Sequence, residues 1–84
     1  MNAKHKKTLA RILGRPTPKT LPFKDVEGLL RGLGCAVVEG DGSRVHFSLN
    51  GQVWYTHRPH PGRDALQYQI RGVRDFLIEI GIES

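Results

Sequence analysis

The sequence predicts a single α+β domain, a two-layer sandwich in which helices cover one face of a three-stranded antiparallel sheet. Three observations predict it: a hairpin signal at Asn50-Gly51, an amphipathic helical pattern before it and another after it. The chain has 84 residues, of which 38% are hydrophobic, and this length allows one small core. We divide the chain into a basic arm with a short helix and a proline linker, residues 1–20, and a folded domain, residues 21–84.

The composition limits the kind of partner and of site. Thirteen Lys and Arg against eight Asp and Glu give a net charge of +5, which favours a polyanion or an acidic protein as partner, although a generically basic protein has the same balance. The single Cys35 excludes an intramolecular disulfide, and without a Cys/His cluster we expect no metal and no other cofactor. No stretch approaches the roughly 18 apolar residues of a membrane span, and the N-terminus lacks a signal-peptide pattern, so we expect a cytoplasmic location.

The arm begins with a basic cluster that includes Lys6 and Lys7. A short helical pattern follows and closes at Gly14, and Pro16 and Pro18 prevent its continuation. We expect a helical turn or two and then an extended linker. Lys6 and Lys7 are candidate contacts to RNA, and the alternative is a solvated, frayed terminus.

The first main helix is expected over residues 23–33. Pro22 suits its start, Gly34 suits its end, and its apolar positions share one face: Phe23, Val26, Leu29, Leu30 and Leu33. Gly28 and Gly32 are expected to permit close packing against the sheet.

Three strands follow, the first over residues 35–39. A two-residue turn at Asn50-Gly51 then fixes the register of a hairpin. The expected pairs on its apolar face are Leu49 with Gln52, Phe47 with Trp54 and Val45 with Thr56. The expected pairs on its other face are His46 with Tyr55 and Arg44 with His57.

The last helix is expected from Asp64 to Ile80, after a break at residues 59–62. Its apolar stripe consists of Leu66, Ile70, Val73, Leu77 and Ile80. A flank of the same helix could follow the phosphates of a nucleic acid, or could be an ordinary solvated face; it consists of Arg63, Gln67, Arg71 and Arg74.

The open face of the hairpin carries groups suited to cleaving an RNA phosphodiester without a metal. That reaction needs a base, an acid and a cation that stabilises the phosphate, and His46, His57 and Arg44 could supply them. Tyr55 is the candidate for stacking on a base, whereas Trp54 is expected to pack in the core. Alternatively, His57 and His60 cap the strand end and His46 is only an exposed residue. The Pro-containing break between His57 and His60 argues against a metal site.

The chain resembles the HicA toxins of bacterial type II toxin–antitoxin systems. The resemblance covers about residues 22–82 and rests on segments 26–34, 42–43, 59–62 and 73–82, in order and at family length. The segments 2–9 and 57–61 resemble one branch of that family. The resemblance implies a double-stranded-RNA-binding-domain fold, whose α-β-β-β-α order is the one expected here.

The resemblance also implies a ribosome-independent endoribonuclease that cleaves mRNA and is neutralised by a HicB antitoxin. The family's active histidine commonly follows Gly-Ser, and here that position is Arg44. His46 lies two residues on, which in a strand is the same face, so His46, His57 or His60 could carry the chemistry. Phosphate contacts are expected from Arg44, Arg58 and the arginine flank. His60 is a further candidate RNA contact and is taken as more structural than catalytic. The alternative is a module of the same fold that binds RNA or an antitoxin without cutting.

Overall fold

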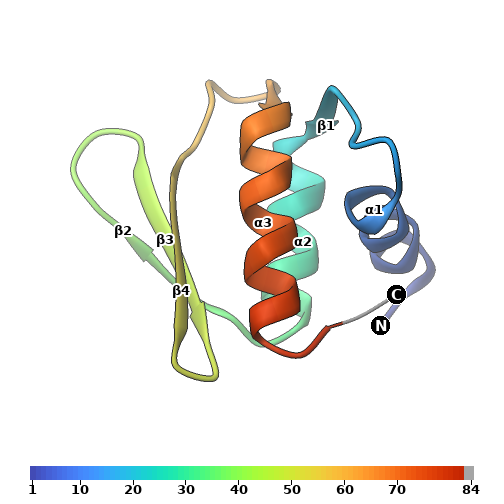
Figure 1. The fold of residues 1–84 in the computed structure, drawn as a ribbon. Helices are drawn as coiled ribbons and strands as arrows, with labels where there is room; N and C mark the ends of the chain where they lie inside the picture. Colours follow the sequence, from blue (N-terminus) through green and yellow to red (C-terminus); the bar gives the residue numbers. More distant parts are fainter. Residues whose placement is uncertain (83–84) are drawn as a thin grey trace.

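The computed structural model describes residues 1–82 and confirms the α+β class. The elements in chain order are α1 (Ala3–Leu13), β1 (Thr20–Pro22), α2 (Phe23–Gly32), β2 (Ala36–Glu39), β3 (Arg44–Leu49), β4 (Gln52–His57), β5 (Asp64–Leu66) and α3 (Gln67–Glu79). Strands β2, β3 and β4 form the antiparallel sheet, with β3 in the centre. Helices α2 and α3 lie side by side against one face of this sheet and leave its other face open (Figure 1).

The hairpin of β3 and β4 has the register expected from its turn. All the predicted pairs are present, from Leu49 with Gln52 to Arg44 with His57. Asn50 and Gly51 both have positive φ, 52° and 79°, as a type I′ turn requires. The covered face contributes Val45 and Phe47 to the core, and Trp54 stacks on Phe47 with ring centroids 5.6 Å apart. Gly72 of α3 permits this packing, because a Cβ there would lie 2.8 Å from the indole Nε1 of Trp54.

A second, two-stranded sheet was not predicted. β1 pairs antiparallel with β5, so that Leu21 lies opposite Ala65 and both are buried. The pairing takes Asp64–Leu66 out of the expected last helix, which therefore begins at Gln67. Leu66 consequently lies outside the apolar stripe of α3 and is 53% exposed. Strands of three residues are too short to show an alternating pattern in the sequence.

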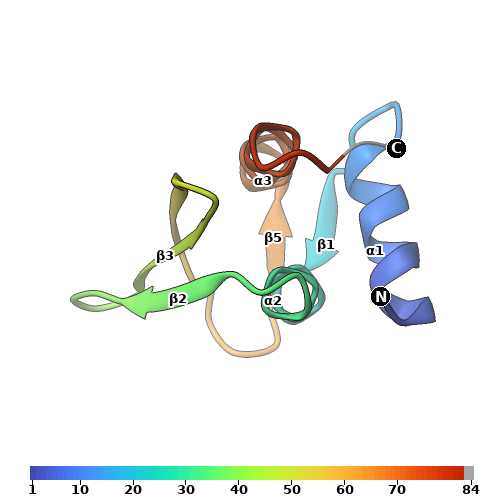
Figure 2. The same ribbon diagram turned by 90° about the horizontal axis from the view of Figure 1, so that it is seen from below.

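The N-terminal helix is longer and better packed than the sequence suggested. α1 has 11 residues, Asn2 caps it by accepting a hydrogen bond from the backbone N–H of His5, and Ile12 is fully buried. It packs on the side of α2 and α3 that faces away from the three-stranded sheet (Figures 1 and 2). Gly28 and Gly32 therefore accommodate α1 and not the sheet: a Cβ on Gly32 would lie 2.7 Å from the imidazole of His5.

Arg74 joins α1 and the following linker to α3. Its guanidinium donates to the carbonyl of Ile12 at 2.9 Å, to the carbonyl of Gly14 at 2.9 Å and to Oγ1 of Thr17 at 2.8 Å. Only 8% of the residue is exposed. This burial corrects the expectation that Arg74 belongs to a phosphate-binding flank, because its donors face the protein interior and not solvent.

Candidate active site

The open face of the sheet holds the predicted catalytic groups close together. Strand alternation places Arg44 and His46 of β3 on this face, and the hairpin register places Tyr55 and His57 of β4 directly opposite them. The ring centroids of His46 and Tyr55 are 5.0 Å apart, and the rings are tilted by 48°. His46 and His57 are diagonal neighbours, a relation that places side chains roughly 7–8 Å apart in an antiparallel pair.

A depression of about 600 Å³ is lined by this whole group. Its lining residues include Arg44, His46, Tyr55 and His57, together with Tyr68 from the first turn of α3. A second depression of about 530 Å³ adjoins it and shares His57 and Tyr68 with the first. The second depression is also lined by Arg58, His60 and Arg63, so the two adjoining depressions together include most of the predicted site residues.

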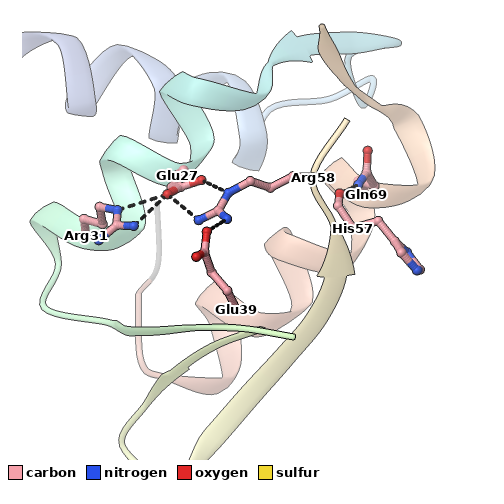
Figure 3. Close-up of polar contacts among 6 residues, drawn as sticks. All are labelled: Glu27, Arg31, Glu39, His57, Arg58 and Gln69. Carbon is pink, nitrogen blue, oxygen red and sulfur yellow. Dashed lines mark hydrogen bonds and ion pairs between the residues drawn. The ribbon is translucent and has the colours of Figure 1, made fainter. Parts of the chain in front are cut away.

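His57 is fixed through its backbone by a side chain that sequence reasoning missed. Gln69 is 5% exposed, and its Nε2 donates to the carbonyl of His57 and to Oγ1 of Thr56, both at 2.9 Å. Its Oε1 accepts the backbone N–H of Leu66 at 3.0 Å. Gln69 thus ties the end of β4 to the start of α3, while the imidazole of His57 points away from it (Figure 3). A polar residue inside the apolar pattern of this helix was the available signal.

Arg58 differs from its predicted role as a phosphate ligand. Its guanidinium makes two hydrogen bonds to Glu27 of α2, at 2.9 and 3.0 Å, and a further ion pair with Glu39 at the end of β2 (Figure 3). Two carboxylates therefore compensate its charge. The result is a link between α2, the end of β2 and the chain that leaves β4, on the side of the strand opposite His57.

The ion pair also shifts the protonation of Glu27. The hydrogen bond from Arg58 lowers the pKa of Glu27 below its ordinary value of 4.5, an effect that Arg31 reinforces and partial burial opposes. A carboxylate whose pKa is lower in the folded protein stabilises the fold above the unfolded-state pKa, and this contribution is lost as the pH falls through the folded-state pKa.

We therefore expect Glu27→Gln to lower the free energy of unfolding at neutral pH by about 1–2 kcal/mol. We also expect the variant to lose less stability than the unsubstituted protein when the pH is lowered from neutrality to below 4.5. Urea unfolding across this pH range measures both effects. Asp75→Asn, at an exposed position of α3, is the matched control. Equal acid sensitivity of the Gln variant and the unsubstituted protein would contradict the role of this ion pair.

The remaining predicted RNA contacts divide into two groups. Arg71 is exposed on α3, where it donates to Oε1 of Gln67 at 3.2 Å. Lys6 and Lys7 are exposed on α1, which lies on the other side of α2 and α3 from the sheet (Figure 2). Lys6 and Lys7 therefore lie away from the open face of the sheet, which carries His46 and His57.

Comparison with known protein families identifies the family to which this chain belongs. The family model described as the HicA toxin of bacterial toxin-antitoxin matches residues 23–82. This range includes α2, the whole three-stranded sheet and α3. The chain belongs to the HicA toxin family. Comparisons with curated proteins and with solved structures found no significant match.

Family membership defines the biological setting of this HicA domain. It is the toxin component of a toxin–antitoxin system, and its partner is an antitoxin. α1 precedes the matched region, although it packs on the HicA domain and contributes Ile12 to its core. No helix within residues 1–82 is long and apolar enough to cross a membrane, and that part of the chain holds no cluster of three or more potential metal ligands among its His, Cys, Asp and Glu residues.

Proposed function

We propose that this HicA toxin is a metal-independent endoribonuclease that cleaves mRNA in the cytoplasm and thereby inhibits translation. The proposal rests on the observation that His46, His57 and Arg44 all line the same depression. Two imidazoles and a guanidinium can supply the base, the acid and the cation that phosphodiester cleavage by the RNA's own 2′-hydroxyl needs.

The chemistry assigns a role to each group. One histidine, neutral, removes the proton of the 2′-hydroxyl, and the 2′-oxygen attacks the phosphorus. The bond from phosphorus to the 5′-oxygen breaks, and the other histidine, protonated, donates a proton to that oxygen. Arg44 stabilises the negative charge on the phosphate oxygens. The products are a 2′,3′-cyclic phosphate and a 5′-hydroxyl.

The partner proposed for this toxin is a HicB-type antitoxin with an acidic surface. The net charge of +5 supports a contact of opposite potential, and a partner that covered the open sheet face would block the depression lined by His46 and His57. A gene for an acidic protein beside the toxin gene would support this pairing.

The test is incubation of the antitoxin-free toxin with a defined mRNA in EDTA and, in parallel, in magnesium. We expect the same cleavage in both, because no step of the proposed reaction uses a metal. Cleavage in magnesium alone contradicts the mechanism.

A non-catalytic RNA-binding module is the second candidate, because Arg44 occupies the position of the family's histidine. RNA that is bound but intact in both buffers would support that candidate.

A further inference from the structure

Tyr68 is the aromatic side chain at this end of the molecule to which neither the fold nor the proposed reaction gives a role. It lies in the first turn of α3 and is 63% exposed. A single exposed aromatic residue is common on protein surfaces. Tyr68, however, lines both depressions next to His57, and Tyr55, 74% exposed, lines the first of them.

The two tyrosines come from different layers of the fold. Tyr55 projects from β4 on the open face of the sheet beside His46, whereas Tyr68 lies on α3 where that helix begins. His57 and Tyr68 belong to both depressions, so they mark the boundary between them. Each depression, at about 600 and 530 Å³, lies within the roughly 300–1,000 Å³ range of small-molecule sites.

Two depressions that meet at His57 suit an RNA substrate, in which the scissile phosphate lies between two nucleotides. A scissile phosphate at His57 has one nucleotide on either side of it, and each base has to be held while the 2′-oxygen moves into line with the leaving oxygen. Exposed tyrosine rings offer flat faces on which an unpaired base can stack. Bases in a duplex are already stacked and paired, and therefore cannot use them.

We propose that Tyr68 is a base-stacking residue, so that the site takes single-stranded RNA with one base on Tyr55 and the neighbouring base across His57 on Tyr68. The cationic and imidazole groups of the second depression, His60 and Arg63, then contact the phosphate that follows. The inference rests on the proposed function for the position of the scissile phosphate, but it is tested by binding alone.

The test measures binding of a short, fluorescein-labelled, single-stranded RNA whose 2′-O-methyl groups prevent cleavage. Four proteins are compared by fluorescence anisotropy at fixed salt: the unsubstituted toxin, Tyr68→Ala, Tyr68→Phe and Ile78→Ala. Ile78 is the control, because it is a large apolar residue of the same helix that is 50% exposed and lines neither depression. Thermal melting of each protein checks that it is folded.

We expect Tyr68→Ala to weaken binding of the single strand about tenfold, which is the loss of one base–aromatic stack. Tyr68→Phe keeps the ring face and should bind within about twofold of the unsubstituted toxin, as should Ile78→Ala. Binding of a blunt RNA duplex of the same sequence should not respond to any of the three substitutions.

Two results overturn the proposal. Unchanged single-strand binding by Tyr68→Ala would show that the ring does not stack on a base and has another role, such as contact with the antitoxin. An equal loss for the Phe and Ala variants would assign the effect to the hydroxyl and not to stacking. The outcome is separable from the proposed function: a toxin that binds this RNA through Tyr68 but leaves unmodified RNA intact retains the stacking site and loses only the nuclease assignment.

Discussion

Replacing Arg74 by alanine is expected to lower the free energy of unfolding by about 3 kcal/mol, because it removes a buried charged group that makes three hydrogen bonds. The buried guanidinium donates to two backbone carbonyls and a hydroxyl of the segment 12–17, and its loss leaves those acceptors without these donors. In a domain of this size, a change of 3 kcal/mol lowers the melting temperature by roughly 12–24 °C. Thermal and urea unfolding followed by circular dichroism measure the effect.

Arg71→Ala is the matched control, because it removes the same side chain one helical turn earlier from an exposed position. Its single hydrogen bond joins it to Gln67 of the same helix, so we expect a change within about 0.5 kcal/mol. Arg74→Lys, which retains the charge but not the fork of donors, should fall between the two. If the Arg74→Ala and Arg71→Ala proteins proved equally stable, the proposed link between α1 and α3 would be wrong.

Replacing His57 by alanine is expected to reduce the rate of RNA cleavage by about 10²- to 10⁴-fold, which is the usual contribution of a general acid or base. His46→Ala should have an effect of the same order. Single-turnover cleavage of a labelled RNA gives the rates.

His60→Ala separates this assignment from its alternative, in which the histidine beyond the strand end carries the chemistry. His60 lines the second depression but not the one that holds His46 and Arg44, so its loss should weaken RNA binding more than it slows the bound reaction. If the His57→Ala protein were fully active and the His60→Ala protein inactive, the second depression would be the site of the reaction.

The hairpin and its site face were predictable because a short turn leaves no freedom of register. Asn50-Gly51 fixes which residues of β3 and β4 lie opposite each other, and the pairs of Arg44 with His57 and of His46 with Tyr55 follow directly. The strongest local signal in the sequence therefore also placed the candidate catalytic groups.

What the sequence could not predict depends on contacts between segments far apart in the chain. Helical periodicity places Arg74 on a flank of α3, but only the packing of α1 shows that this flank is covered. Arg58 likewise appeared free to bind phosphate until the fold brought Glu27 and Glu39 to it from two other elements. Tyr68 and Gln69 carried no motif, and their significance depends on α3 beginning next to the end of β4.

The central claim is that this toxin cuts RNA by attack of the 2′-hydroxyl, with His46 and His57 transferring the protons. The most direct measurement is the chemical identity of the new RNA ends produced in EDTA by the unsubstituted toxin and by the His46→Ala/His57→Ala double variant. We predict 2′,3′-cyclic phosphate and 5′-hydroxyl ends from the first and no fragments from the second. Fragments with 5′-phosphate and 3′-hydroxyl ends, or cleavage that persists in the double variant, would contradict the account.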